Sequence, residues 1–109
     1  MRKNSSKQFD RNGSSSPLVH LEYNHPTATE VCIAGTFNDW RPEATPMIGL
    51  GHGRWMKQLT LPPGVYEYRF VADGNWMPDP LASEITPNPF GGVNSVLRIE
   101  AASPAKPSQ

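Results

Sequence analysis

The sequence predicts an all-β fold, an antiparallel β-sandwich built by a single domain. The chain of 109 residues contains 12 prolines and 9 glycines, which separate short apolar segments as turns separate short strands. Within most of these segments apolar and polar residues alternate, and no segment keeps a helical period of 3.6 over about ten residues. Six or seven short strands joined by such turns are typical of an immunoglobulin-like sandwich.

Two strands are expected before residue 40. The segment LVHLEYN at 18–24 places Val19, Leu21 and Tyr23 on one face, because successive side chains of a strand point to opposite faces. The segment EVCIAGTF at 30–37 is a nearly continuous apolar run, which indicates a central strand.

The second half of the chain contains three longer alternating segments. They are RWMKQLTL at 54–61, VYEYRFVAD at 65–73 and VNSVLRIE at 93–100. In the second of these the aromatic side chains face one way, and Glu67 and Arg69 face the other. The Asp-Gly pair at 73–74 predicts a hairpin, and Trp76 begins the return strand.

The ends of the chain and its charge exclude several classes of protein. Residues 1–17 are rich in Ser, Lys, Asn and Arg, and residues 101–109 are small, polar and Pro-containing, so we expect disordered tails around a domain at 18–100. Lys plus Arg and Asp plus Glu both equal 10, which argues against binding nucleic acid or an anionic membrane. Neither a signal peptide nor a membrane-spanning run is expected. The favoured partner is a neutral ligand or a protein, and the expected location is cytoplasmic.

The sequence offers no constellation for catalysis, metal binding or cofactor binding. The single cysteine, Cys32, is interpreted as a small buried hydrophobe. The three histidines lie in different segments without metal-ligand spacing. Asp39, Asp73 and Asp79 stand next to Asn, Gly or Pro, where aspartates cap turn amides. We therefore expect a protein that is not an enzyme.

A distinctive set of side chains is left once the core and the turns are assigned. Its members are Trp40 and Trp76 after bends, Arg69 opposite the aromatic face, Phe90 in the loop TPNPFGG, and Asn94 on the polar face of the last strand. Aromatic rings pack on the C–H face of a sugar, and guanidinium and amide groups bond its hydroxyls. The set is typical of a pocket for a neutral polar ligand.

Each of these side chains also has a purely structural interpretation. Trp40 could be a core tryptophan reached from a loop, and Trp76 could cap the end of the sandwich. Arg69 could form only a surface ion pair with Glu67 or another neighbour. Phe90 could plug the sandwich end, and Asn94 could bond only to backbone. The third tryptophan, Trp55, follows the apolar register of its strand and is expected in the core.

The motifs GTFNDW, YEYRFVADGNW, the DP pair at 79–80 and PNPFGGVNSV resemble a known family over about residues 18–100. They are similar to the glycogen-binding domain of the AMP-activated protein kinase β subunit and to the early-set domains at the N-termini of isoamylases and glycogen-branching enzymes. Together these form carbohydrate-binding module family 48. The resemblance implies an early-set sandwich that binds α-1,4-linked glucan without catalysis.

The resemblance also implies roles for individual residues. Trp40 and Trp76 fall on the two stacking tryptophans, Arg69 on a basic residue that is usually lysine in the kinase subunit, and Asn94 on a hydroxyl-bonding asparagine. Phe90 falls near a leucine threaded through the curve of the glucan, one residue further from Trp76. A contacting threonine of the family is replaced by glycine at 92, so that contact should be missing.

The implied partner is an α-glucan such as glycogen, starch, a maltooligosaccharide or cyclodextrin, and a glucan-processing enzyme is a further possible partner. A different class of function fits the same surface. A protein-interaction or regulatory module associated with a glucan-processing enzyme or kinase could use the aromatic patch for a protein partner.

Overall fold

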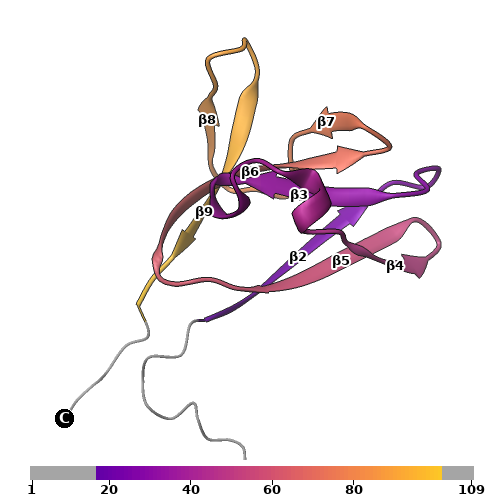
Figure 1. The fold of residues 1–109 in the computed structure, drawn as a ribbon, viewed down its shortest axis with the longest axis horizontal. Helices are drawn as coiled ribbons and strands as arrows, with labels where there is room; N and C mark the ends of the chain where they lie inside the picture. The colour runs from indigo at the N-terminus through magenta and orange to yellow at the C-terminus, as the bar shows by residue number, and fades with distance from the viewer. Residues whose placement is uncertain (1–16, 102–109) are drawn as a thin grey trace, which may run out of the picture.

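The computed structural model describes residues 17–101, which form two antiparallel β-sheets (Figure 1). The all-β sandwich predicted from the sequence is confirmed. The expected tails fall outside the described residues except for Pro17 and Ala101, so their disorder stays a prediction. Within 17–101, no helix is long and apolar enough to cross a membrane.

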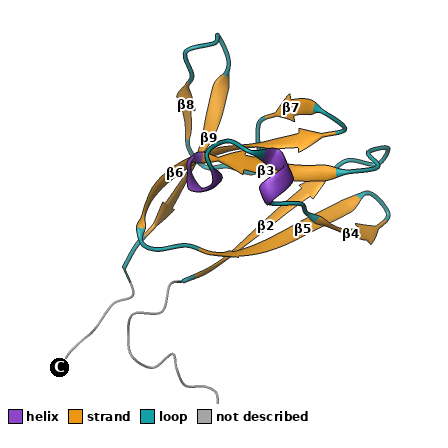
Figure 2. Cartoon of the chain, in the orientation of Figure 1, coloured by secondary structure: helices purple, strands orange, loops and turns teal. Residues whose placement is uncertain are grey.

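The smaller sheet has three strands in the order β2-β5-β4. They are β2 (Leu18–Asn24), β5 (Arg54–Thr60) and β4 (Ile48–Gly51). The larger sheet has the order β3-β6-β9-β8, and β7 also pairs with β6. Its strands are β3 (Val31–Gly35), β6 (Gly64–Ala72), β9 (Val93–Ile99), β8 (Ile85–Pro87) and β7 (Asn75–Met77). Figure 2 shows that helical structure is confined to short turns, η2 (Thr36–Asn38) and η3 (Pro42–Ala44).

The core lies between the two sheets and uses the faces that alternation predicts. Tyr68 and Phe70 of β6 are buried, as are Leu21 and Tyr23 of β2. The rings of Tyr23 and Phe70 lie 4.5 Å apart, centroid to centroid, and such aromatic pairs add to the free energy gained by burial. The buried cluster consists of Leu21, Tyr23, Val31, Ile33, Met47, Tyr68, Phe70 and Ala72, with Phe37 and Trp55 packed against it. The core position expected for Trp55 and the burial expected for Cys32 are confirmed.

The expected strand at 30–37 is too long, because β3 ends at Gly35. Asn38 causes this ending. Its Oδ1 accepts a hydrogen bond from the Gly35 amide at 3.0 Å, and its Nδ2 donates to the Ile33 carbonyl at 2.9 Å and to Thr45 Oγ1 at 2.9 Å. Side-chain bonds of this kind compete with the ladder of a sheet. The chain therefore leaves the sheet in η2 and turns across its edge.

Both strand β7 and strand β9 pair with one edge of β6. β9 pairs along Gly64 to Tyr68, and β7 pairs along Phe70 to Ala72. Arg69 lies at the junction, where one partner strand has ended and the other has not begun. In Figure 1 the β8–β9 and β6–β7 hairpins stand on the same side of the molecule, away from β2, β5 and β4.

Candidate functional site

A strained turn places the first tryptophan. Asp39 and Trp40 both have left-handed backbones, with φ of 57° and 58°. Aspartate tolerates this conformation, but for a large side chain it is an outlier that costs about 1–2 kcal/mol. The turn is held by the Trp40 amide, which donates to the Gly35 carbonyl at 2.9 Å, and by the Arg41 amide, which donates to Asn38. Strain of this kind collects at functional sites, and here its result is an indole held at the surface rather than in the core.

The second tryptophan and the arginine are joined by a direct hydrogen bond. Trp76 lies on β7 opposite Val71 and is 41% exposed. Nη2 of Arg69 donates to the Trp76 carbonyl at 3.2 Å. The alternative ion pair of Arg69 with Glu67 does not form, since neither residue belongs to a salt bridge within residues 17–101. Arg69 Nε is buried and has no partner among those residues.

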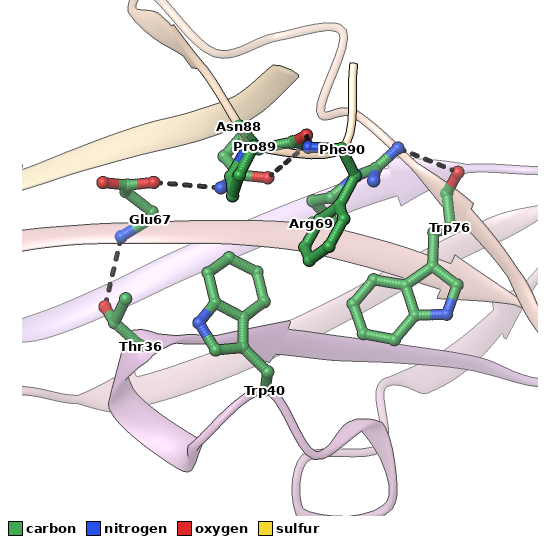
Figure 3. Close-up of a pocket in the computed structure, with 9 residues that line it drawn as sticks. Thr36, Trp40, Glu67, Arg69, Trp76, Asn88, Pro89 and Phe90 are labelled. Atoms are coloured by element: carbon green, nitrogen blue, oxygen red, sulfur yellow. Dashed lines mark hydrogen bonds between the residues drawn. The ribbon is translucent and has the colours of Figure 1, made fainter. Parts of the chain in front are cut away.

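The two indoles form one bent surface. The ring centroids of Trp40 and Trp76 are 6.5 Å apart, and the ring planes meet at 33°. A ring held between two parallel faces needs a separation of roughly 7–8 Å, twice the optimal contact distance of carbon atoms. A flat ring therefore does not fit between these indoles, which together offer one bent apolar surface. Figure 3 shows the two indoles side by side along one wall of the groove.

The opposite wall is the β8–β9 loop, which carries Phe90. Oδ1 of Asn88 accepts hydrogen bonds from the amides of Phe90 at 2.8 Å and Gly92 at 3.1 Å. The side chain of Phe90 is 92% exposed, so it does not plug the end of the sandwich. Figure 3 shows its ring reaching over the groove toward the indoles. An asparagine in an Asx turn thus displays an apolar ring in solvent.

A chain of hydrogen bonds runs along the floor of the groove. Asn88 Nδ2 donates to Asn94 Oδ1 at 3.2 Å, and Asn94 Nδ2 donates to Glu67 Oε1 at 2.9 Å. The Glu67 amide donates to Thr36 Oγ1 at 3.2 Å. Asn94 lies on the groove side of β9, as alternation predicts, but only 6% of it is exposed. Its side chain bonds other side chains, so the alternative of backbone bonding alone is wrong.

The structure brings all five predicted residues to one groove of about 490 Å³. The groove is lined by Thr36, Trp40, Glu67, Arg69, Trp76, Asn88, Pro89, Phe90 and Asn94. Four of these were missed by sequence reasoning. Alternation along β6 could have found Glu67, because it shares a face with Arg69. Asn88 and Pro89 lie in the loop that was singled out for Phe90 alone, and Thr36 was assigned to a strand that ends one residue earlier.

The groove has no catalytic pair. Glycoside hydrolysis uses two carboxyl groups on either side of the scissile bond, and Glu67 is the one acidic residue among the lining side chains. Asp73 caps Thr29 and Glu30, and Asp79 accepts from the Leu81 amide and the Tyr68 hydroxyl. No cluster of His, Cys, Asp or Glu in residues 17–101 could hold a metal ion.

Cys32 and Tyr68 are both uncharged at neutral pH. Burial raises the pKa of the Cys32 thiol, with a smaller contribution from Glu30. Burial also raises the pKa of Tyr68, and its hydrogen bond to Asp79 adds to the effect. Both groups are therefore protonated at neutral pH, and neither lines the groove.

Comparison with known proteins identifies similar chains. A family model described as the glycogen recognition site of AMP-activated protein kinase matches residues 18–105. The chain is 34% identical over 71 residues to 5'-AMP-activated protein kinase subunit beta-2 of Homo sapiens, which covers 65% of this chain and 25% of that protein. It is 32% identical over 71 residues to subunit beta-1 of Sus scrofa, covering 65% and 55% of the two chains.

A plant protein is similar over a longer stretch. The chain is 33% identical over 81 residues to Protein FLOURY ENDOSPERM 6, chloroplastic, of Oryza sativa subsp. japonica, covering 74% of this chain and 15% of that protein. The chain thus spans about a quarter of the human kinase subunit and a smaller share of the rice protein. The similarity concerns one module of these longer proteins.

Proposed function

The chain belongs to the family of the glycogen recognition site of AMP-activated protein kinase, and from that premise we propose that it is a non-catalytic module for α-1,4-linked glucan. Its ligands are glycogen, starch, maltooligosaccharides and cyclodextrin. One observation carries the proposal: two indoles lie 6.5 Å apart at 33° along one groove. A helically curved α-glucan presents successive sugar faces at an angle, which a bent aromatic surface matches.

The binding residues are Trp40, Trp76, Arg69, Phe90 and Asn94. The two indoles stack on the apolar faces of neighbouring glucose units, and the Arg69 guanidinium donates to hydroxyls beside Trp76. Phe90, extended from the opposite wall, packs against the glucan from the other side. Asn94 contributes from the floor of the groove through the hydrogen-bond chain described above.

The affinity for a short oligosaccharide is modest. Each indole hides on the order of 100 Å² of apolar surface against a sugar, which contributes about 2.5 kcal/mol. Two stacks and a few hydrogen bonds, less the cost of association, leave about −4 to −7 kcal/mol. That range corresponds to a Kd of roughly 10 μM to 1 mM. A branched polymer offers many equivalent sites and is retained more strongly.

Sedimentation with insoluble starch or glycogen tests this function. Wild type is expected in the pellet, and the double variant Trp40→Ala plus Trp76→Ala in the supernatant. Cellulose is a control polymer, because its flat chains match a flat aromatic strip rather than one bent by 33°. Wild type that stays in solution, or a double variant that sediments equally well, rules the proposal out. Turnover of maltoheptaose by purified protein would show that the chain is an enzyme.

A second candidate is a protein-interaction or regulatory module, in which the groove or another face binds a glucan-processing enzyme or a kinase. It is favoured by the similarity to proteins named as kinase subunits and by the exposed side chains Ile48 and Leu50 on the edge strand β4. Under this candidate alone, the sedimentation experiment gives no retention on either α-glucan. The cytoplasmic location expected from the sequence remains part of the proposal.

A further inference from the structure

Both polar atoms of the Asn94 side chain are already hydrogen-bonded, and the residue is buried. A side-chain amide has two N–H donors and one carbonyl oxygen. Nδ2 of Asn94 already donates to Glu67 at 2.9 Å, and Oδ1 already accepts from Asn88 at 3.2 Å. Only 6% of the residue is exposed. The orientation of the amide is therefore fixed from both sides, and it serves the groove chiefly through the residues it bonds.

Glu67, in contrast, lines the groove and has an acceptor oxygen without a hydrogen bond in the described part of the chain. Its Oε1 accepts from Asn94, whereas Oε2 has no hydrogen-bond partner within residues 17–101. The backbone of Glu67 is fixed by the hydrogen bond of its amide to Thr36 Oγ1 and by pairing with Val96 of β9. Two oxygens of an ionised carboxylate accept about four hydrogen bonds in total. Glu67 therefore has spare acceptor capacity on a fixed backbone position that lines the groove.

The two charged side chains differ in hydrogen-bonding character and lie in different parts of the groove. Arg69 only donates hydrogen bonds and lies beside Trp76, to whose carbonyl it is bonded. Glu67 only accepts them and lies beside Thr36, and Figure 3 shows Trp40 below these two charges. The charges do not neutralise each other, since they form no salt bridge among the described residues. A sugar hydroxyl beside Arg69 accepts a hydrogen bond, and a sugar hydroxyl beside Glu67 donates one.

We propose that Glu67 contacts the ligand and determines specificity: its free carboxylate oxygen accepts a hydrogen bond from a hydroxyl of the glucose unit stacked on Trp40, and Asn94 is the positioning residue that holds this carboxylate. The inference rests on the proposed glucan-binding function.

The variant Glu67→Gln tests the contact with little change of shape. The glutamine carbonyl still accepts from Asn94, but the group facing the ligand becomes an NH₂ donor. Charge-assisted hydrogen bonds are roughly twice as strong as neutral ones. We therefore expect the Kd for β-cyclodextrin, measured by calorimetry, to rise about three- to tenfold. The matched control is Glu100→Gln, an exposed glutamate outside the groove, for which the Kd stays within about twofold.

A double-mutant cycle with Asn94→Ala separates positioning from contact. If Asn94 acts through Glu67, its removal weakens binding in wild type but changes little in the Glu67→Gln background. Equal losses in both backgrounds would show that Asn94 binds the sugar independently, and would overturn its positioning role. Thermal unfolding checks that each variant is folded. Should Asn94→Ala not fold, the Glu67→Gln comparison decides the proposal by itself.

The outcomes also separate this inference from the function on which it rests. Wild type that binds β-cyclodextrin, together with Glu67→Gln of unchanged Kd, refutes the role of Glu67 and leaves glucan binding intact. Wild type that binds neither β-cyclodextrin nor maltoheptaose refutes the proposed function itself.

Discussion

At the scale of single residues, Trp40 and Trp76 supply most of the apolar surface that a sugar ring would cover. Replacing either by alanine removes about 2.5 kcal/mol of stacking free energy, so we expect the Kd for maltoheptaose to rise about 70-fold, measured by calorimetry. Leu81→Ala is the control, because it removes an exposed apolar side chain that does not line the groove. An equal loss for Leu81→Ala would mean that the ligand binds elsewhere.

A second prediction at this scale concerns Asp73 and the pH dependence of stability. Hydrogen bonds from the hydroxyl and amide of Thr29, then from the Glu30 amide, lower the pKa of its carboxyl. A lowered folded-state pKa stabilises the fold above the unfolded pKa of about 4, and this contribution is lost as pH falls through the folded value. Asp73→Asn should therefore lower the Tm at pH 7, with a difference that shrinks toward pH 2.

The control for this prediction is Asp39→Asn. Asp39 shares the left-handed backbone, with φ of 57° against 49° for Asp73, but its carboxylate makes no hydrogen bond within residues 17–101. Its substitution should leave the Tm and its pH dependence nearly unchanged. A deficit of Asp73→Asn that is the same at pH 2 and pH 7 would contradict the electrostatic explanation.

At the scale of elements, the site depends on how closely β3 approaches β6. A Cβ at Gly35 would lie 2.6 Å from the Glu67 carbonyl oxygen and 2.9 Å from Tyr68 Cβ. Since these atoms cannot move without shifting the sheet, Gly35→Ala should lower the free energy of unfolding by about 1–3 kcal/mol, measured by urea denaturation. Gly64→Ala is the matched control in β6, because its nearest contact is an ordinary 3.5 Å. Equal losses would show that the close approach is unimportant.

The elements also show what the sequence could and could not predict. Alternation located β2, β5, β6 and β9 because each buries one face. It missed β4 (IGLG) and β8 (ITP), which are short, contain Gly or Pro, and exist because they pair with β5 and β9. Local pattern carries information about burial but little about pairing partners.

The candidate site divides in the same way. The exposed aromatics and Arg69 were predictable, since each is conspicuous in its own segment. Asn94 was also predicted, but its hydrogen bond to Glu67 was not, because the two residues meet across 27 residues of sequence. Neither residue type is unusual on the polar face of a strand. Only the pairing of β6 with β9 brings these side chains together.

At the scale of the whole molecule, the groove and the cover of the core belong to different sheets. Every residue that lines the groove belongs to the five-stranded sheet or its connections, and β2, β5 and β4 contribute none. The three-stranded sheet instead covers the core, through residues such as Tyr23 and Trp55. Stability and binding should therefore respond separately to changes in the smaller sheet.

Trp55→Phe tests this separation. Trp55 packs against the core from β5, and a smaller ring leaves unfilled space, which costs about 1–2 kcal/mol. For a domain of this size we expect the Tm to fall by roughly 4–8 °C per kcal/mol, while the Kd for β-cyclodextrin at 20 °C stays within about twofold. Saturating ligand should raise the Tm of wild type and Trp55→Phe by similar amounts, because ligand stabilises whichever protein it binds by mass action. A Kd that rises in step with the loss of stability, in a sample still folded at 20 °C, would show that the smaller sheet shapes the groove after all.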